Sequence, residues 1–260
     1  MNKVITVASL KGGVAKTTTS LGLVAAAVEA GEHVVLIDLD PGRGSSKILG
    51  VDGAANTVLG ALQGGPVEAS ATSCDSWPVN VTVFPGDRRL SVRPAPAEGL
   101  ARIVEWARNR ADLVVVDTEN TQGSLSVPLG VADRIVIPLF PDLLGIRGAE
   151  ETLGFVEHLG LIDRVGGIVF TQVPARVEKM VRATMSYYQD TVRAAYRSTI
   201  SRGVAWQNFQ TGTRLSDRAR DECVALLNEV RTTTADRGGL NDIAVPYGVE
   251  SRYAALPGVY

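Results

Sequence analysis

Lys11 and Lys16 flank a glycine pair close to the start of the chain, in the segment "SLKGGVAKTTT" at residues 9–19. Ordinary phosphate-binding loops follow the pattern G-x-x-x-x-G-K-[ST], but Leu10 and Ala15 occupy the two outer glycine positions here. Such a loop binds phosphate because successive backbone N–H groups point into a concavity in front of a helix. The segment therefore predicts a phosphate site with one lysine more than the pattern requires.

The residue types in this loop suit the parts of a nucleotide–metal complex. Glycine lets the backbone approach phosphates with no Cβ in the way. Lys16 is expected to reach the β- and γ-phosphates of ATP, and the Thr17 hydroxyl to bind Mg²⁺. The residues predicted to bind nucleotide here are Lys11, Gly12, Gly13, Val14, Ala15, Lys16, Thr17 and Thr18.

Two apolar runs end in aspartate. "VVLIDLDPGRGSS" places Asp38 and Asp40 after one run, and "ADLVVVDTEN" places Asp117 after another. An aspartate that follows a hydrophobic strand can hold Mg²⁺ through water, so Asp117 is a candidate metal residue. Phosphoryl transfer needs a positioned nucleophile and charge compensation more than covalent help, which suits carboxylates at this place.

The elements around these motifs alternate between strand and helix. Continuous β-branched runs predict strands at 4–8, 33–39, 81–84, 113–118, 134–140 and 166–171. Helices are expected at 17–30, 97–110, 147–159, 176–194 and 216–233. Strands without polar alternation are typical of a parallel sheet buried on both faces. We therefore predict an α/β fold: a doubly wound, mostly parallel sheet of about seven strands with helices on both faces, binding ligands at the strands' carboxyl ends.

The composition favours one globular domain. Hydrophobic residues make up 45% of the 260-residue chain, and no run approaches the roughly 18 apolar residues of a membrane-spanning helix. The two cysteines form no CxxC pair, so the expected location is the cytoplasm. Residues 1–234 are predicted to form the domain, with a surface excursion at 50–78 and an irregular C-terminal extension at 235–260.

These motifs resemble the deviant Walker A, switch I and Walker B motifs of the ParA/MinD-type ATPases, and the similarity extends over residues 3–232. "KGGVAKTTT" matches K-G-G-x-x-K-[ST], with Lys11 as the signature lysine. The resemblance implies that Asp40 orients the attacking water and Asp38 lies near the metal–phosphate shell. It therefore implies catalytic roles for Lys11, Lys16 and Asp40, and a metal site at Thr17, Asp38 and Asp117, with ATP and Mg²⁺ as cofactors.

The chain departs from the family at several positions. Gly42 and Arg43 follow "DP", where the family usually has Gln-Gly, and Glu119 and Asn120 follow "DT", where Pro or Ala is frequent. The extra carboxylate is interpreted either as tuning hydrolysis or as contacting a partner. Ser201 and Gly203 fall where relatives enclose the adenine, and are assigned to nucleotide binding by that position alone.

In this family the signature lysine reaches the nucleotide of a second subunit, so the resemblance implies an ATP-gated homodimer. Members differ in what the dimer binds. The last 20 residues hold one basic residue, Arg252, and no amphipathic stripe, which argues against a membrane. Residues 171–231 hold ten basic and six acidic residues, which favours contact with a polyanion. The predicted DNA-binding residues are Arg193, Arg197, Arg202, Arg214 and Arg218.

The predicted function is therefore ATP-dependent DNA partition on the nucleoid, with slow hydrolysis of ATP. ATP-bound dimers would bind DNA non-specifically, and a centromere-binding ParB-like protein would stimulate hydrolysis. Two alternatives stay open. One is an ATPase of this class that positions a protein cargo, such as conjugation or secretion machinery. The other is an ATP-gated DNA-binding scaffold with negligible turnover.

Overall fold

The structure is a computed structural model. It describes residues 4–74, 80–174, 176, 179–191, 193–202, 215–232 and 240. Arg214, Gly203 and nearly all of the segment 235–260 lie outside these residues, so the predictions made for them stay predictions.

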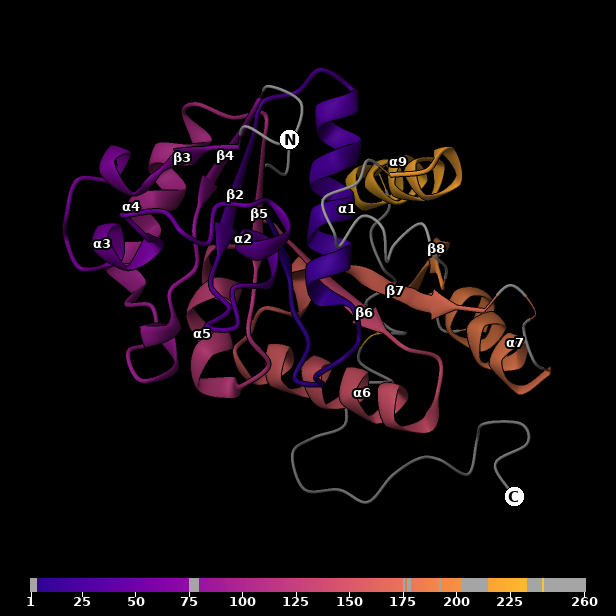
Figure 1. Ribbon diagram of the computed structural model, residues 1–260. Helices are drawn as coiled ribbons and strands as arrows, with labels where there is room; N and C mark the ends of the chain where they lie inside the picture. The colour runs from indigo at the N-terminus through magenta and orange to yellow at the C-terminus, as the bar shows by residue number, and fades with distance from the viewer. Residues whose placement is uncertain are drawn as a thin grey trace.

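An eight-stranded sheet forms the centre of the molecule, with helices on both faces (Figure 1). The order across it is β3-β4-β2-β5-β1-β6-β7-β8, in which β3 runs antiparallel to β4 and the other neighbours are parallel. The strands are β1 (Val4–Val7), β2 (Val34–Asp38), β3 (Thr72–Ser73), β4 (Val81–Phe84), β5 (Leu113–Asp117), β6 (Arg134–Leu139), β7 (Val165–Val173) and β8 (Ala195–Ser201). The predicted doubly wound sheet is confirmed, with one strand more than expected.

Helices cover both faces of the sheet. They are α1 (Lys16–Glu29), α2 (Gly44–Ile48), α3 (Val58–Leu62), α4 (Ala97–Arg108), α5 (Gln122–Val131), α6 (Leu143–His158), α7 (Lys179–Ser186) and α9 (Asp217–Thr232). Helices α1 and α9 pack against each other on one face, and α4, α5 and α6 lie on the other (Figure 1). Each central strand therefore sends apolar side chains in both directions, which explains why the strands lack polar alternation.

Strand β2 illustrates this double burial. Val34 and Leu36 pack in the core under α1, whereas Val35 and Ile37 pack in the core under α3 and α4. Asp38 ends the strand and is the register partner of Asp117 at the end of β5. Parallel pairing thus brings two carboxylates from distant parts of the chain to one edge of the sheet.

The prediction of one helix is wrong over the second half of its segment. The segment 176–194 was expected to be a single helix, but α7 ends at Ser186 and a π-helical turn follows at Tyr187–Thr191. The chain then enters edge strand β8, whose sequence "AYRSTIS" is polar and only partly buried. An edge strand covered mainly on one side needs no continuous apolar run, so the sequence pattern did not reveal it.

The segment 50–78 is more than a surface excursion. It contains α3, in which Val58 and Leu62 are buried in the core. Helix α4 approaches so closely that a Cβ on Gly99 would lie 2.3 Å from the Leu62 carbonyl oxygen. Short buried helices in a segment rich in Gly, Ala and Ser carry too few residues to show a helical period.

Helix α5 was not expected because Pro128 lies inside it. The missing proline N–H leaves a helical carbonyl without its usual donor. Thr121 caps the helix by accepting a hydrogen bond from the Ser124 N–H, and the Thr6 hydroxyl donates to the Pro128 carbonyl at 3.1 Å. Tertiary contacts therefore support a helix that the local sequence disfavours.

Candidate nucleotide site

The predicted phosphate loop connects β1 to α1 and has the backbone of a tight turn. Gly13 has φ +78°, and Ala15, which directly precedes α1, has φ 64° and ψ 37°. This left-handed conformation favours glycine, the residue that the ordinary loop has at position 15. Alanine therefore keeps the loop geometry at a conformational cost of roughly 1 kcal/mol.

The end of β7 holds two carbonyls of this loop. The Thr171 hydroxyl donates to the Val14 carbonyl at 3.0 Å, and the Gln172 side-chain amide donates to the Gly13 carbonyl at 2.8 Å. In a trans peptide the next N–H points away from the carbonyl, so these bonds turn backbone N–H groups away from β7. The sequence did not single out Gln172. In the structure its φ of 53° is a left-handed value, which is uncommon for a residue other than glycine and marks an unusual backbone position.

Lys16 points back across its own loop. Its Nζ donates to the Lys11 carbonyl at 3.3 Å. Burial lowers the pKa of Lys16, and the carboxylates of Asp117, Asp40 and Glu119 oppose that shift. The ammonium thus lies among three carboxylates at the start of α1, where the β- and γ-phosphates are expected.

Asp117 is fully buried and accepts hydrogen bonds from three hydroxyls on two helices. Ser20 donates from α1 at 3.1 Å, Ser45 donates from α2, and Thr17 donates at the start of α1. The sequence did not single out Ser45 or Ser20. Asp117 therefore joins the phosphate loop to the segment that follows β2.

Asp38 lies beside Asp117 and is also fully buried. Its Oδ2 accepts from the Ser46 N–H at 3.0 Å and the Ser46 hydroxyl at 2.5 Å, and its Oδ1 accepts from the Asp40 N–H at 3.1 Å. A Cβ on Gly86 would lie 2.9 Å from the Asp38 carboxyl carbon, so only glycine fits there without a shift. The carboxylate is thus enclosed by donors and by backbone.

The donor set fits Mg²⁺. Asp38, Asp117 and Thr17 supply carboxylate and hydroxyl oxygens, which are the ligands that this hard cation prefers, and water completes such sites. Two carboxylates held together in a buried space leave negative charge that a divalent cation compensates. The predicted metal residues therefore share one place next to the phosphate loop.

The same pair of carboxylates makes the stability of the nucleotide-free protein depend on pH. Burial, and then the charge of Asp117, raises the pKa of Asp38 to about 7, and burial raises the pKa of Asp117. A carboxyl whose pKa is higher in the folded than in the unfolded state stabilises the fold fully below its unfolded value, near 3.9, and this contribution is lost as the pH rises through the folded value.

We therefore expect the Tm of the nucleotide-free protein to fall by on the order of 5 °C between pH 5 and pH 8. Thermal unfolding in a chelator, repeated across that range, measures the slope. Asp38→Asn should flatten it, because one titrating group is gone. Equal slopes for the two proteins would contradict the assignment.

Asp40 lies at the mouth of the site and is only partly buried. Its Oδ1 accepts from the Gly42 N–H at 2.7 Å, so part of the carboxylate holds its own turn. Arg43 follows with φ 57°, and its guanidinium donates to the Asp52 carbonyl at 3.0 Å. The Gly42–Arg43 departure therefore forms a left-handed turn whose arginine is anchored beyond α2.

Lys11 lies outside this cluster, against α6. A Cβ on Gly148 would lie 2.5 Å from the Lys11 Cβ, so the lysine stem packs directly on the helix backbone. The neighbouring Leu10 N–H donates to the Thr152 hydroxyl at 3.0 Å, and that hydroxyl donates to the Gly148 carbonyl. Helix α6 thereby holds the start of the loop, and the two lysines have separate environments.

Comparison with known proteins agrees with this geometry. Residues 2–162 match the family described as an AAA domain. The chain is a ParA/MinD-type ATPase. It is 25% identical to the sporulation initiation inhibitor protein Soj of Bacillus subtilis over 78% of this chain and 86% of that protein. It is 29% identical to the chromosome-partitioning ATPase Soj of Thermus thermophilus over 82% of this chain and 83% of that protein.

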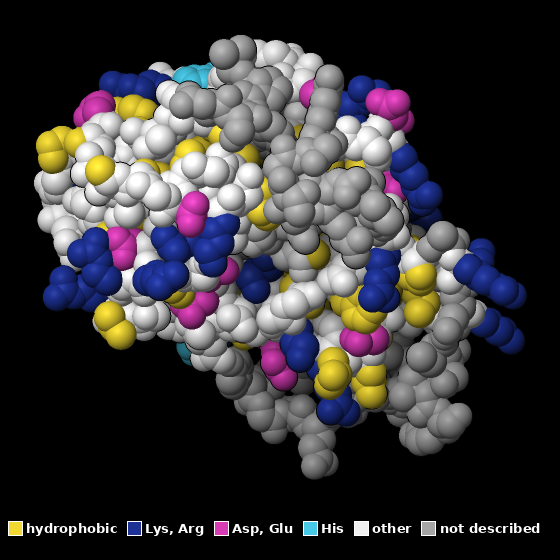
Figure 2. All heavy atoms as spheres, viewed as in Figure 1, with side chains coloured by type: hydrophobic (Ala, Val, Ile, Leu, Met, Phe, Trp, Pro, Cys, Tyr) yellow, Lys and Arg dark blue, Asp and Glu magenta, His cyan; other side chains and the backbone are white. Residues whose placement is uncertain are grey.

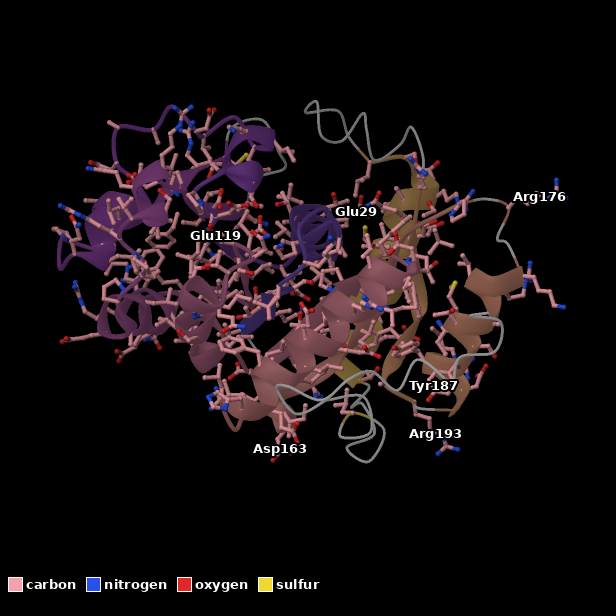
Figure 3. The ribbon with its side chains drawn as sticks, turned by 90° about the horizontal axis from the view of Figure 1, so that it is seen from below. Glu29, Glu119, Asp163, Arg176, Tyr187 and Arg193 are labelled. Carbon is pink, nitrogen blue, oxygen red and sulfur yellow. The ribbon has the colours of Figure 1, made fainter. Side chains whose placement is uncertain are left out.

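The fold is shared with solved structures of this class. The septum site-determining protein MinD of Pyrococcus horikoshii, complexed with Mg-ADP, superposes with a TM-score of 0.74 at 19% identity, covering 89% of this chain and 97% of that one. Figure 3 shows the molecule from below. In this view α1 is seen nearly end-on, and Glu119 lies toward the middle of the molecule.

The four predicted DNA-binding arginines that the structure describes, Arg193, Arg197, Arg202 and Arg218, lie on different elements. Arg193 precedes β8 and Arg202 follows it, so the two lie at opposite ends of a seven-residue strand, about 20 Å apart. Arg197 forms an ion pair with Asp190 at 2.6 Å, and Arg218 pairs with Glu222 at 3.2 Å. The side chains are exposed, but their placement alone does not define a DNA site.

Further exposed cations lie on α7, the helix that precedes β8 in the chain. Lys179 and Arg182 are exposed on α7, and Figure 2 shows Lys and Arg side chains projecting from that side of the molecule. Figure 3 shows Arg176 and Arg193 well apart at the two ends of the same region. The described basic residues of this third of the ATPase are therefore spread over α7, β8 and its two ends, and α9.

The remaining predicted site residues have structural partners or lie in the first helical turn. Both the N–H and the hydroxyl of Ser201 donate to Glu222 on α9 at 3.0 Å, at the carboxyl end of β8. Thr18 is buried in the first turn of α1. Within the segment 235–260 the structure describes only Leu240, which is buried in the core near α6. None of the helices that the structure describes has the length and apolar character needed to span a bilayer.

Proposed function

We propose that this ParA/MinD-type ATPase partitions DNA. ATP would hold two copies together, the dimer would bind DNA non-specifically on the nucleoid, and a centromere-binding ParB-like protein would stimulate slow hydrolysis. Mg²⁺ would be held by Thr17, Asp38 and Asp117. Support comes from the matches to Soj proteins, one of them a chromosome-partitioning ATPase, over most of both chains.

The observation that carries the nucleotide-gated dimer is the separation of the two lysines. Lys16 is partly buried and lies within the field of the site's carboxylates, whereas the Lys11 stem lies on Gly148 of α6. One cation is thus committed to the nucleotide of its own subunit. Lys11 starts outside that cluster of carboxylates. A second copy that packed against the opening of this nucleotide site would present the γ-phosphate of its own nucleotide to Lys11.

Lys11→Ala is therefore expected to bind ATP within a few-fold of the unchanged protein but to stay a monomer. Loss of one charge-assisted contact to phosphate across the interface costs about 2 kcal/mol, and each dimer has two such contacts. Light scattering with ATP and Mg²⁺ measures the change, with Asp40→Ala included to slow hydrolysis. An ATP-dependent dimer of the alanine variant at unchanged protein concentration would contradict the cross-subunit role.

DNA binding rests on exposed cations along α7 and β8. Exposed ion pairs such as Arg197–Asp190 are screened by solvent and contribute little to stability, so a DNA phosphate can replace the carboxylate. Non-specific binding needs only phosphate contacts, which release counterions and make affinity fall steeply with salt. A dimer doubles the number of such contacts, which explains how ATP would control the affinity.

A binding titration on an arbitrary-sequence duplex with ATP–Mg²⁺, ADP–Mg²⁺ or no nucleotide tests this function. We expect tight, salt-sensitive binding with ATP only. Replacing Arg193 and Arg202 together by alanine should weaken binding and reduce the salt slope. Arg88→Ala, which removes an exposed arginine after β4, is the matched control. Absence of binding in every nucleotide state would refute DNA partition.

Positioning of a protein cargo is the second candidate. It is favoured by the fold shared with MinD and by the internal ion pairs of Arg197 and Arg218. It keeps the same ATP cycle but predicts no DNA dependence. The titration above therefore separates the two functions.

A further inference from the structure

The segment that follows Asp117 has an unusual pair of polar residues. Thr118 is buried, and its hydroxyl donates to the Val7 carbonyl at 2.8 Å, which fixes the direction of the backbone after β5. Glu119 therefore follows the carboxyl end of β5 two positions after Asp117, at the edge of the sheet where the phosphate loop also lies.

Two observations place Glu119 at the reacting end of the site. The neighbouring Asn120 amide nitrogen lies 3.2 Å from where a Cβ on Gly12 would be, so this segment packs on the phosphate-loop turn. The charge of Glu119 also acts on the Lys16 ammonium, together with those of Asp117 and Asp40. Since Lys16 contacts the β- and γ-phosphates in such loops, Glu119 lies close to the γ-phosphate position.

The Glu119 carboxylate has acceptor positions available near the expected γ-phosphate position. It is half-buried, and its carboxylate has no hydrogen-bond or ion-pair partner among the residues that the structure describes. The other carboxylates are engaged: Asp117 accepts from three hydroxyls, Asp38 accepts from three donors, and Asp40 uses Oδ1 for the Gly42 N–H. A partly desolvated carboxylate with unused acceptor positions is available to a water molecule.

We propose that Glu119 is a second carboxylate that orients the attacking water, beside Asp40. In the reaction the water oxygen bonds to the γ-phosphorus while the bond to the bridging oxygen breaks and its electron pair leaves with ADP. The water's proton passes to the released phosphate. Glu119 accepts a hydrogen bond from the water and thereby fixes its direction of attack, which is the main contribution that a protein makes to this transfer.

The inference depends on ATP hydrolysis by this family and not on DNA or cargo, so it can fail while partition stands. Single-turnover hydrolysis with ATP–Mg²⁺ is measured for the unchanged protein, Asp40→Ala, Glu119→Ala and the double variant. We expect Glu119→Ala alone to lower the rate constant about tenfold, and the double variant to fall below Asp40→Ala by a further factor of about ten. Glu119→Gln keeps an acceptor oxygen and should lie between Glu119→Ala and the unchanged protein.

ATP affinity separates orientation from a purely electrostatic effect. Removing a negative charge near the γ-phosphate should leave the Kd for ATP unchanged or lower, so a slower step with equal or tighter binding supports the proposal. Glu98→Ala removes an exposed carboxylate at the start of α4 and should change neither quantity. The proposal is overturned if Glu119→Ala hydrolyses ATP at the unchanged rate, or if its whole effect is a weaker Kd.

Discussion

Lys16→Ala is expected to weaken ATP binding by at least two orders of magnitude. The lysine places a partly buried ammonium where the β- and γ-phosphates are expected to bind. Its present partners are one loop carbonyl and the charges of three carboxylates. Two charge-assisted contacts to phosphate of about 1.5–3 kcal/mol each account for a loss of that size. Removing the cation also leaves the carboxylates uncompensated beside an incoming polyanion.

Isothermal titration with ATP–Mg²⁺ gives the affinity directly. The variant should remain folded, because burial lowers the pKa of Lys16 and shows that the folded state disfavours this charge. Unchanged far-UV circular dichroism therefore distinguishes lost binding from lost folding. Lys11→Ala is the matched control, since it removes a cation from the same loop outside this cluster. Equal ATP affinity of Lys16→Ala and the unchanged protein would contradict the phosphate-loop assignment.

Asp117→Asn should abolish Mg²⁺-dependent hydrolysis while making the nucleotide-free protein more stable. The amide removes a full negative charge from the expected metal position, so we expect hydrolysis to fall at least 100-fold. Burial raises the pKa of this carboxyl, which means that ionising it costs the folded state free energy. The neutral amide avoids that cost, although it can accept fewer of the hydroxyl hydrogen bonds made by Ser45, Ser20 and Thr17.

Two measurements on the same sample check this prediction. Phosphate release at saturating Mg²⁺ reports the activity, and the Tm at pH 8 without nucleotide reports the stability. Asp221→Asn, an exposed change on α9, should leave both unchanged. A Tm that falls together with the activity would show that the carboxylate holds the fold and is not a cost to it.

The phosphate loop could be predicted because all its parts are adjacent in the chain. A buried strand, a glycine pair and a helix that begins at Lys16 stand in that order in the sequence. Asp38 and Asp117 could be expected to meet because parallel strands bring their carboxyl ends to one edge. The structure pairs the two strand ends in register, and Asp117 accepts a hydrogen bond from Thr17.

Several supports of the site come from remote segments and have no sequence signal. Ser45, Gln172 and Gly148 are common residue types, and each acts only because the fold places it against the loop or against Asp117. Strand β8 was missed because an edge strand is not a continuous apolar run. Its position also separates Arg193 from Arg202, which belong to one predicted DNA-binding set.

The sequence by itself determined the six parallel strands from β4 to β7, the two-lysine loop and the carboxylates at the strand ends, because those features arise from local periodicity and from residues close along the chain. Tertiary structure alone decided which hydroxyls surround Asp117, where Lys11 lies, and that the Glu119 charge acts on Lys16 while its carboxylate has no hydrogen bond among the described residues. These depend on contacts between segments more than 70 positions apart, such as Ser45 and Asp117. Packing of the whole sheet sets such contacts, and no local pattern encodes them.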